Sequence, residues 1–240
     1  MDFADLTSTN EHAAALIQQQ DVIEGTLIRA DFQSGGKGYA GNSWQSEKGK
    51  NLLLSIILKP KFLPAKRQFF LNQVISLAVA ATVEDFVIKE NVKIKWPNDI
   101  LFGEKKIAGI LIENSVQGNF IQYSIVGVGL NVNQINFSGL QKKATSMACI
   151  TGKKFSLNKV LDDLCEKLEY RYLQLKNNHV DQIQKDYMKQ LFRVEEESDY
   201  STAGKTFMGK IVGLTAEGKL ILQVNNQHEV FGFKEIEMII

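Results

Sequence analysis

The spacing of hydrophobic positions along the chain changes several times and predicts both helices and strands. Residues 66–90 carry apolar side chains at helical spacing with no glycine or proline among them, which predicts a long helix. Residues 26–32 alternate apolar and polar side chains, and residues 51–58 are almost continuously apolar, as half-buried and buried strands are. Further strands are predicted at 93–96, 100–102, 107–112 and 120–128, the last three forming an antiparallel meander.

The pattern also indicates where the first helix begins and where helices give way to short strands separated by glycines. Ser8, followed by Glu11 and an apolar run, is typical of a capping box at a helix start. Two later helices are predicted at 156–176 and 179–192. After residue 193, short apolar runs lie between glycines and predict a small β-barrel; they cover 210–214, 219–224 and 228–233.

The order of these elements favours one fold class. Helices and strands do not alternate strictly, so we expect an α+β fold rather than a doubly wound parallel sheet. The expected architecture is a mixed, mainly antiparallel sheet with helices on one face, followed by the small barrel. We expect two domains, residues 1–193 and 194–240, divided near the acidic run at 195–197.

Composition and charge narrow the class of protein. With 44% hydrophobic and 23% charged residues, the chain has the composition of a globular protein, which excludes disorder. Its 28 basic and 27 acidic residues give no overall attraction for a polyanion, so no nucleic-acid partner is expected. Cys149 and Cys165 cannot build a disulfide framework, and no apolar stretch reads as a signal peptide or membrane span. We therefore expect a cytoplasmic protein without a membrane partner.

A glycine-rich loop after the strand at 26–32 is the first candidate for chemistry. Residues 36–41 match the G-x-G-x-x-G pattern, but the polar segment behind them does not resemble the helix that a dinucleotide-binding unit needs. What remains is physical: closely spaced glycines let backbone N–H groups approach an anion, and Lys37 adds a positive charge. The alternative is an ordinary surface loop.

Three further motifs place polar groups at strand ends. Residues 95–99, KWPND, put Asn98 and Asp99 after a proline that ends strand pairing. Lys106 enters the apolar strand at 107–112, and residues 127–133, GVGLNVN, end a strand with two glycines and two amides. Each motif also has a structural reading, as a turn, a solvated hairpin charge or a β-bulge.

Together, and in this order, these motifs resemble the biotin protein ligase family. The likeness rests on STN at 8–10, Gln33, GKG at 36–38, Trp44, KWPND at 95–99, KKIAGILIE at 105–113, GVGLNVN at 127–133 and KATSM at 143–147. It runs from about residue 8 to 150. It continues in the tail, where GKIVGLTAEGKL at 209–220 is similar to the family's SH3-like C-terminal domain.

The resemblance implies a two-step ligase. The carboxylate of biotin would attack the α-phosphate of Mg²⁺-ATP to give biotinyl-adenylate and pyrophosphate, and a lysine of a biotin carboxyl carrier protein would then attack the acyl group. Only seven residues precede the STN element, so the resemblance implies the form without the N-terminal DNA-binding domain. A homodimer through an exposed edge strand stays open.

The resemblance also implies roles for particular residues. The biotin-binding set is Ser8, Thr9, Asn10, Gln33, Gly36, Lys37, Gly38, Tyr39, Lys106 and Gly109. The ATP-binding set is Lys37, Gly38, Tyr39, Trp44, Asn98, Asp99, Lys106 and Asn131. The catalytic set is Lys106, Lys37 and Asp99, with Lys106 neutralising the reacting anions and Asp99 accepting a proton from the carrier lysine. Metal ligands are not assigned, and Trp44 and Trp96 either wall the pocket or pack in the core.

Two positions depart from the family pattern. The family loop usually carries a second and a third basic residue, where this chain has Tyr39 and Asn42. With Lys37 as the loop's only cation, we expect the adenylate to be lost faster than from a relative with the full basic loop. Lipoate or octanoate attachment and a non-catalytic biotin sensor remain alternatives, although the GGKG loop, KWPND and the predicted barrel favour biotin.

Overall fold

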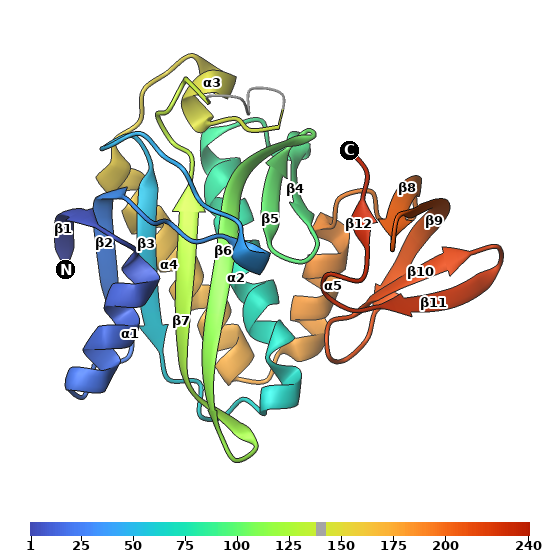
Figure 1. The fold of residues 1–240 in the computed structure, drawn as a ribbon, viewed down its shortest axis with the longest axis horizontal. Coiled ribbons are helices and arrows are strands. Elements are labelled where there is room, and N and C mark those ends of the chain that lie inside the picture. Colours follow the sequence, from blue (N-terminus) through green and yellow to red (C-terminus); the bar gives the residue numbers. More distant parts are fainter. Residues whose placement is uncertain (138–142) are drawn as a thin grey trace.

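The computed structural model describes residues 1–137 and 143–240 and contains two β-sheets flanked by helices (Figure 1). The larger sheet has seven strands, in the order β1 (Asp2–Leu6), β2 (Thr26–Gln33), β3 (Leu52–Leu58), β7 (Phe120–Leu130), β6 (Lys105–Gln117), β5 (Asp99–Phe102) and β4 (Val92–Lys95). Only β1 and β2 are parallel; the other neighbours are antiparallel. The mixed, mainly antiparallel sheet is thus confirmed, and β1 is a strand that the sequence pattern did not predict.

Helices cover both faces of this sheet. One face carries α2 (Phe69–Phe86), α4 (Leu157–Lys176) and α5 (Val180–Gln190), and the opposite face carries α1 (Thr9–Gln19). Two-sided burial of the strands is the reason: Leu54 and Ile56 of β3 join the core under α2, while Ile57 packs with Ala13 of α1. The expectation of helices on one face therefore holds for three helices and is wrong for α1. A short helix, α3 (Met147–Thr151), follows the sheet.

The long helix α2 forms the centre of the main core. The window Ala65–Phe86, which includes a preceding 3₁₀ turn, is long and apolar enough to cross a membrane. However, 72% of its most apolar 18-residue window is buried inside the molecule, with Val74, Ala78 and Val79 fully enclosed. This burial is what the core helix of a folded domain shows.

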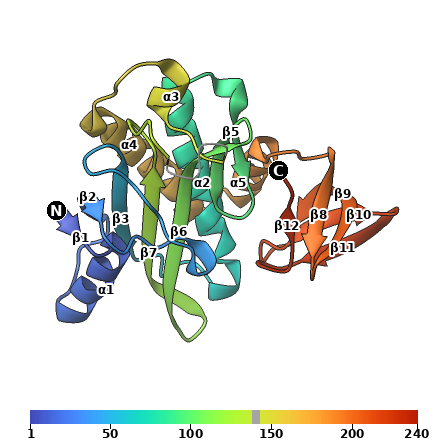
Figure 2. The ribbon, with the colours of Figure 1, turned by 45° about the horizontal axis from the view of Figure 1, so that its top comes forward.

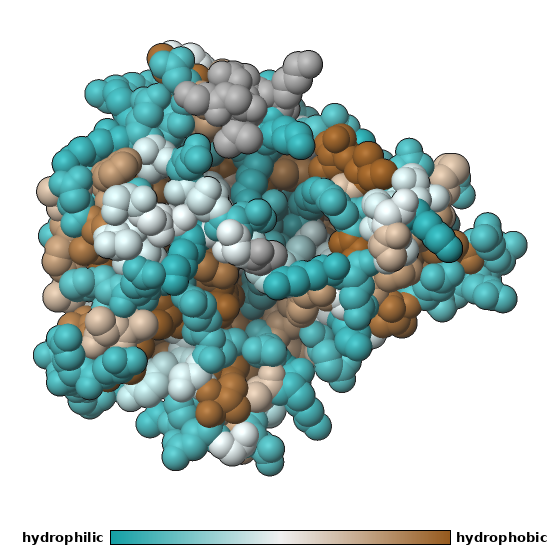
Figure 3. All heavy atoms as spheres, in the orientation of Figure 1, coloured by the Kyte–Doolittle hydropathy of each residue, from teal (hydrophilic) through white to brown (hydrophobic). Residues whose placement is uncertain are grey.

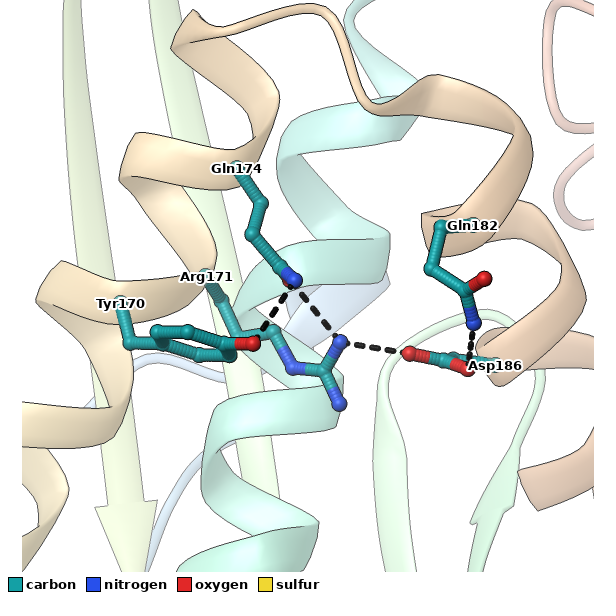
Figure 4. Close-up of polar contacts among 5 residues, drawn as sticks. All are labelled: Tyr170, Arg171, Gln174, Gln182 and Asp186. Carbon is teal, nitrogen blue, oxygen red and sulfur yellow. Dashed lines mark hydrogen bonds and ion pairs between the residues drawn. The ribbon is translucent and has the colours of Figure 1, made fainter.

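Polar contacts join α4 to α5 at the surface of the helical layer (Figure 4). Arg171 of α4 places Nη1 2.7 Å from an oxygen of Asp186 on α5. The same guanidinium donates to Gln174, which donates in turn to the hydroxyl of Tyr170, and Gln182 donates to the second oxygen of Asp186. The network links α4 to α5, which precedes the second sheet in the chain.

The smaller sheet lies beside the main body (Figures 1 and 2). Its antiparallel strands run in the order β11 (Gln227–Phe231), β10 (Leu220–Val224), β9 (Lys205–Leu214), β8 (Glu197–Thr202) and β12 (Glu237–Met238). The three apolar runs predicted after residue 193 form strands β9 to β11. Closure into an SH3-like barrel, and the domain boundary at 193/194, stay predictions.

Aromatic side chains join the two sheets. The ring of Trp96, after β4, stacks on Phe233 with centroids 5.2 Å apart, and Phe69 of α2 packs on the same ring at 5.6 Å. The indole N–H of Trp96 donates to the carbonyl of Gly218 at 2.9 Å. Trp96 therefore positions the small sheet against the main body.

The closest approach at this interface leads to a stability prediction. Gly218 has a φ of +85°, and a Cβ there would overlap the ring of Phe69. We expect Gly218→Ala to lower the free energy of unfolding by about 1–3 kcal/mol, the usual cost of overpacking. Gly204→Ala is the matched control, because Gly204 also has a positive φ, +78°, but has open space around it. Equal losses in chemical denaturation would show that backbone strain, not the contact with Phe69, sets the cost.

Candidate functional site

A cavity lies on the α1 face of the large sheet, over β6 and β7, where the glycine loop crosses in front of the strands (Figure 1). Its lining includes most of the residues selected from the sequence: Ser8, Thr9, Asn10, Gln33, Lys37, Gly38, Tyr39, Trp44, Asn98, Lys106 and Gly109. Segments far apart in the chain therefore meet at one place. Gly36, Asp99 and Asn131 are not part of this lining, and each is described below.

The floor of the cavity is built from glycines on neighbouring strands. A Cβ at Gly129 of β7 would overlap the indole of Trp44, and one at Gly109 of β6 would lie 3.0 Å from it. A Cβ at Gly127 would lie 2.5 Å from Oδ1 of Asn10. Because these strand positions point toward α1, only glycine lets the indole and the amide rest on the sheet. The two glycines of GVGLNVN act as close-approach positions, not as a bulge.

A buried polar cluster closes one end of the cavity. Gln33 accepts hydrogen bonds from the backbone N–H of Thr9 at 2.7 Å and from its hydroxyl at 3.1 Å. Ser55 of β3 contacts Oγ1 of Thr9 at 2.7 Å and donates to Oδ1 of Asn10. Asn10 in turn donates to Glu113 at 2.6 Å. Held by one another, these groups form a fixed set of donors and acceptors.

The start of α1 does not form the predicted capping box. Ser8 occupies the N-cap position, but its side chain makes no capping hydrogen bond and lines the cavity instead. Glu11 pairs with Lys37, whose Nζ lies 2.8 Å from Oε1. This pairing raises the pKa of Lys37. The loop's cation is therefore held by α1 in this conformation, and an anion in the cavity would compete with Glu11 for it.

At the other end of the cavity, Lys106 faces a carboxylate and an aromatic ring. Its Nζ lies 2.6 Å from Oδ1 of Asp99 and 5.5 Å from the centroid of the Trp44 ring. Asp99 begins β5, opposite Gly109 of β6, which places the pair at the cavity's edge. The arrangement puts an ion pair in a partly water-excluded space, where charges interact more strongly than in bulk water.

The two asparagines of the motifs serve partly as structural links. Asn98 is buried, and its amide donates to the carbonyl of Ile110 at 2.7 Å, which ties the turn after Pro97 to β6. Asn131 donates to the carbonyl of Thr145 at 3.0 Å, while its Oδ1 is buried with no partner among the described residues. Gly36 is paired with Trp44 within the loop: the backbone N–H of Trp44 donates to the carbonyl of Gly36 at 2.8 Å.

Trp44 nearly fills the cavity. Only about 40 Å³ remains open, enough for a water or two but not for a larger ligand. The indole N–H of Trp44 is buried and has no hydrogen-bond partner within residues 1–137 and 143–240. Such a group costs free energy unless a ligand or water satisfies it. A bound ligand therefore requires the loop that carries Trp44 to move.

A second, larger space of about 620 Å³ lies between the main body and the small sheet. It shares Tyr39 and Asn98 with the first cavity, so the two adjoin, and Asp99 also lines it. In the space-filling view, a recess bordered by hydrophilic residues separates the small sheet from the main body (Figure 3). Lys95 of β4 projects into it, and burial lowers the pKa of this lysine.

Three site residues escaped the sequence analysis. Ser55 is the single polar residue in the apolar strand LLLSIIL, a signal that could have revealed it. Glu113 lies at the end of a quoted motif, but its bond to Asn10 joins positions 103 residues apart, which no local pattern shows. Glu11 was interpreted as a capping residue, and its true partner, Lys37, comes from another segment.

A glycine-floored cavity with a buried polar end and a lysine beside a carboxylate defines a small-molecule site on an α+β fold. The sequence profile of the biotin/lipoate A/B protein ligase family matches residues 3–131, and the chain belongs to this family.

Relatives and solved structures extend the likeness to nearly the whole chain. The bifunctional ligase/repressor BirA of Bacillus subtilis is 29% identical over 98% of this chain and 73% of its own length. The biotin–[acetyl-CoA-carboxylase] ligase of Mycobacterium tuberculosis is 27% identical over 92% of this chain and 81% of its own. The structure of the biotin protein ligase from Aquifex aeolicus in complex with biotin and ATP aligns with a TM-score of 0.83 and 27% identity, covering 100% and 97% of the two chains.

The contact between Trp44 and the glycine floor can be tested by fluorescence. The chain has two tryptophans, so a Trp96→Phe background reports Trp44 alone. We expect Gly129→Ala in this background to displace the indole and shift its emission to longer wavelength, as in water. Gly213→Ala is the control, because a Cβ there would make only an ordinary contact at 3.7 Å. An unchanged spectrum for Gly129→Ala would contradict the packing of Trp44 on β7.

Proposed function

We propose that the chain is a biotin protein ligase, which activates biotin with ATP as biotinyl-adenylate and transfers it to a lysine of a biotin carboxyl carrier protein. The observation that carries the proposal is the single cavity that joins a buried polar cluster at one end to Lys106 at the other. The likeness to the Aquifex aeolicus ligase holding biotin and ATP supports the same assignment.

The polar cluster suits the ureido head of biotin. A ureido group has one carbonyl acceptor and two N–H donors, and the cluster of Ser8, Thr9, Asn10, Gln33 and Ser55 carries groups of both kinds. Because Thr9, Asn10, Gln33 and Ser55 already bond one another, these four side chains are oriented before the ligand arrives. Biotin would then point its carboxylate toward Lys106.

In the first step, Lys106 would neutralise two anions that repel each other. A carboxylate oxygen of biotin attacks the α-phosphorus of ATP, the bond to the β-phosphate breaks, and pyrophosphate leaves. Lys37, once released from Glu11, and the backbone N–H of Tyr39 would cover the phosphate, whereas the N–H of Gly38 donates to the carbonyl of Asn42 at 2.7 Å in this conformation. Trp44 must leave the glycine floor to admit the ligand, and the loop that carries it would then close over the mixed anhydride and shield it from water.

In the second step, Asp99 would receive the proton of the incoming amine. The carrier's lysine must lose a proton to attack the acyl carbon, and AMP leaves as the amide bond forms. Asp99 lies 2.6 Å from Lys106 and faces the larger cavity, through which a protein side chain could enter. The Lys106–Asp99 pair would therefore serve both steps from opposite sides.

The nucleotide would lie across the two adjoining cavities, which share Tyr39 and Asn98. The unpartnered Oδ1 of Asn131 adds a buried acceptor near this region. Mg²⁺ would arrive with ATP as part of the substrate. Within residues 1–137 and 143–240, no group of three or more His, Cys, Asp or Glu residues is placed to hold a metal ion, so the protein's contribution to that ion is left unassigned.

The decisive experiment offers the chain two alternative substrates, biotin and lipoate, and follows the complete reaction. The chain is incubated with ATP, Mg²⁺, an apo carrier domain and either labelled biotin or labelled lipoate, and the carrier is weighed by mass spectrometry. Biotin added to the carrier supports the proposal; lipoate added instead assigns the chain to the other branch of its family. Tight biotin binding with no transfer would identify a non-catalytic sensor.

A cytoplasmic location and a possible homodimer belong to the same proposal.

Loss of Lys106 tests the first step. We expect Lys106→Ala to slow biotin-dependent exchange of pyrophosphate into ATP by about 30- to 1000-fold, because removing a charged group that stabilises a transition state costs ~2–4 kcal/mol. Lys105→Ala is the matched control, since the neighbouring lysine is exposed and does not line either cavity. Exchange at the wild-type rate in Lys106→Ala would remove Lys106 from the catalytic set.

Closure of the glycine loop gives a second test. Because a ligand needs Trp44 to move and the loop to close again, biotin with ATP should protect residues 34–50 from trypsin, which cleaves after Lys37, Lys48 and Lys50. The measurement is the rate of cleavage with each ligand alone and with both. Cleavage in a segment remote from the site, such as 153–154, serves as the internal control. Equal rates within 34–50 under all conditions would exclude loop closure.

A further inference from the structure

The small sheet touches the glycine loop directly. The Nζ of Lys234, from the connection between β11 and β12, lies over the ring of Tyr39 at 5.9 Å from its centroid. Both ribbon views show the loop's short helix on the side of the main body that faces the small sheet (Figures 1 and 2). Tyr39 is one of the two positions where the loop lacks an expected basic residue, so a cation from elsewhere in the chain stands beside it.

The turn that carries Lys234 is held rigidly. Glu235 closes it by accepting a hydrogen bond from the N–H of Gly232 and donating its own N–H to the Gly232 carbonyl at 3.2 Å. The hydroxyl of Thr202 donates to the carbonyl of Glu235 at 2.6 Å. Phe233, between them, is stacked on Trp96. Lys234 therefore projects from a platform whose position is fixed by the main body.

The backbone at Lys234 is in an unusual conformation. Its φ is +68°, in the left-handed region that non-glycine residues with long side chains seldom occupy. Such a conformation costs free energy and persists where surrounding contacts enforce it, often at functional positions. Here the contacts of Glu235 and Phe233 enforce it, and the result is that the side chain of Lys234 points across the recess to the loop.

The ammonium of Lys234 is available for this contact. Glu235, next to it, is engaged with Gly232, and Lys234 takes part in no ion pair within residues 1–137 and 143–240. Burial raises the pKa of Tyr39, so the ring stays a neutral π face at physiological pH. A cation over a neutral aromatic face within about 6 Å is attracted to it.

We propose that Lys234 is a positioning residue that holds the glycine loop closed through the ring of Tyr39, so that the small sheet, not a cation of the loop, retains the reaction intermediate. The inference rests on the proposed ligase function. It accounts for the departure at position 39, where a neutral aromatic residue gives the loop a face that a lysine from another segment can hold. The larger cavity lies directly beneath this contact, since Tyr39 and Lys234 both line it.

A double-mutant cycle on the release of the intermediate tests the contact. Labelled biotinyl-adenylate is formed on the full chain, unlabelled biotin is added, and the decay of bound label is followed. We expect Lys234→Gln and Tyr39→Leu each to speed release by about two- to five-fold, the effect of losing one exposed cation–π contact. The double variant should be no faster than either single variant, because both remove the same contact.

A conservative variant separates this role from a structural one. Lys234→Arg keeps a cation over the ring of Tyr39, so it should release the intermediate at the wild-type rate. Lys205→Gln is the matched control: Lys205 lies on the same sheet, is exposed and does not line the cavity. Thermal unfolding of every variant checks that the fold is intact. If a variant at one of the two positions, 39 or 234, misfolds, the variant at the other position still tests the contact.

The outcomes distinguish the two proposals. If wild type forms no biotinyl-adenylate, the ligase function itself fails. If wild type forms it and Lys234→Gln releases it at the wild-type rate, or if the two single effects add in the double variant, only the role of Lys234 is overturned. An increase in the KM for the carrier with unchanged release would likewise overturn it and assign Lys234 to protein binding.

Discussion

The site depends on the absence of three side chains from the large sheet. Gly109, Gly127 and Gly129 lie on the face that β6 and β7 turn toward α1, where any Cβ would press against Trp44 or Asn10. A sheet face is normally a layer of side chains, and a flat backbone floor exists only where glycine occupies successive outward positions. On the other face of the same strands, Val126 and Val128 are buried under α2, so the floor cannot shift to relieve a substitution.

This floor explains how one strand pair serves both stability and chemistry. Alternate residues of β7 give the core its packing and the cavity its space, and the period of two keeps the two functions apart. Lys106 lies near the start of β6, where the pairing of β5 with β6 shifts register between Ile100 and Leu101. The irregularity lets the ammonium turn toward Asp99 and Trp44 rather than into the core.

The sequence pattern predicted the elements whose formation depends on their own apolar residues. The apolar spacing at 66–90 predicted α2, most of which is buried, and the continuous apolar run at 51–58 predicted β3, which is buried along its whole length. The strand β1 was missed because DFADL is short, carries two aspartates and forms only by pairing with β2. Placement of α1 on the opposite face, and the pairing of Glu11 with Lys37, depend on contacts between distant segments that no window of sequence contains.

The same limit explains why the loop looked deficient from its sequence alone. Counting cations in residues 36–42 leaves only Lys37, and the structure shows that α1 holds this cation through Glu11. The conformation of the loop also depends on contacts with other segments, and one of these segments is the turn of the small sheet that carries Lys234. Trp96, predicted as pocket wall or core, docks Phe233, and through that turn it sets where Lys234 meets Tyr39. Trp96 of the KWPND motif thereby links the position of the small sheet to the glycine loop over the cavity.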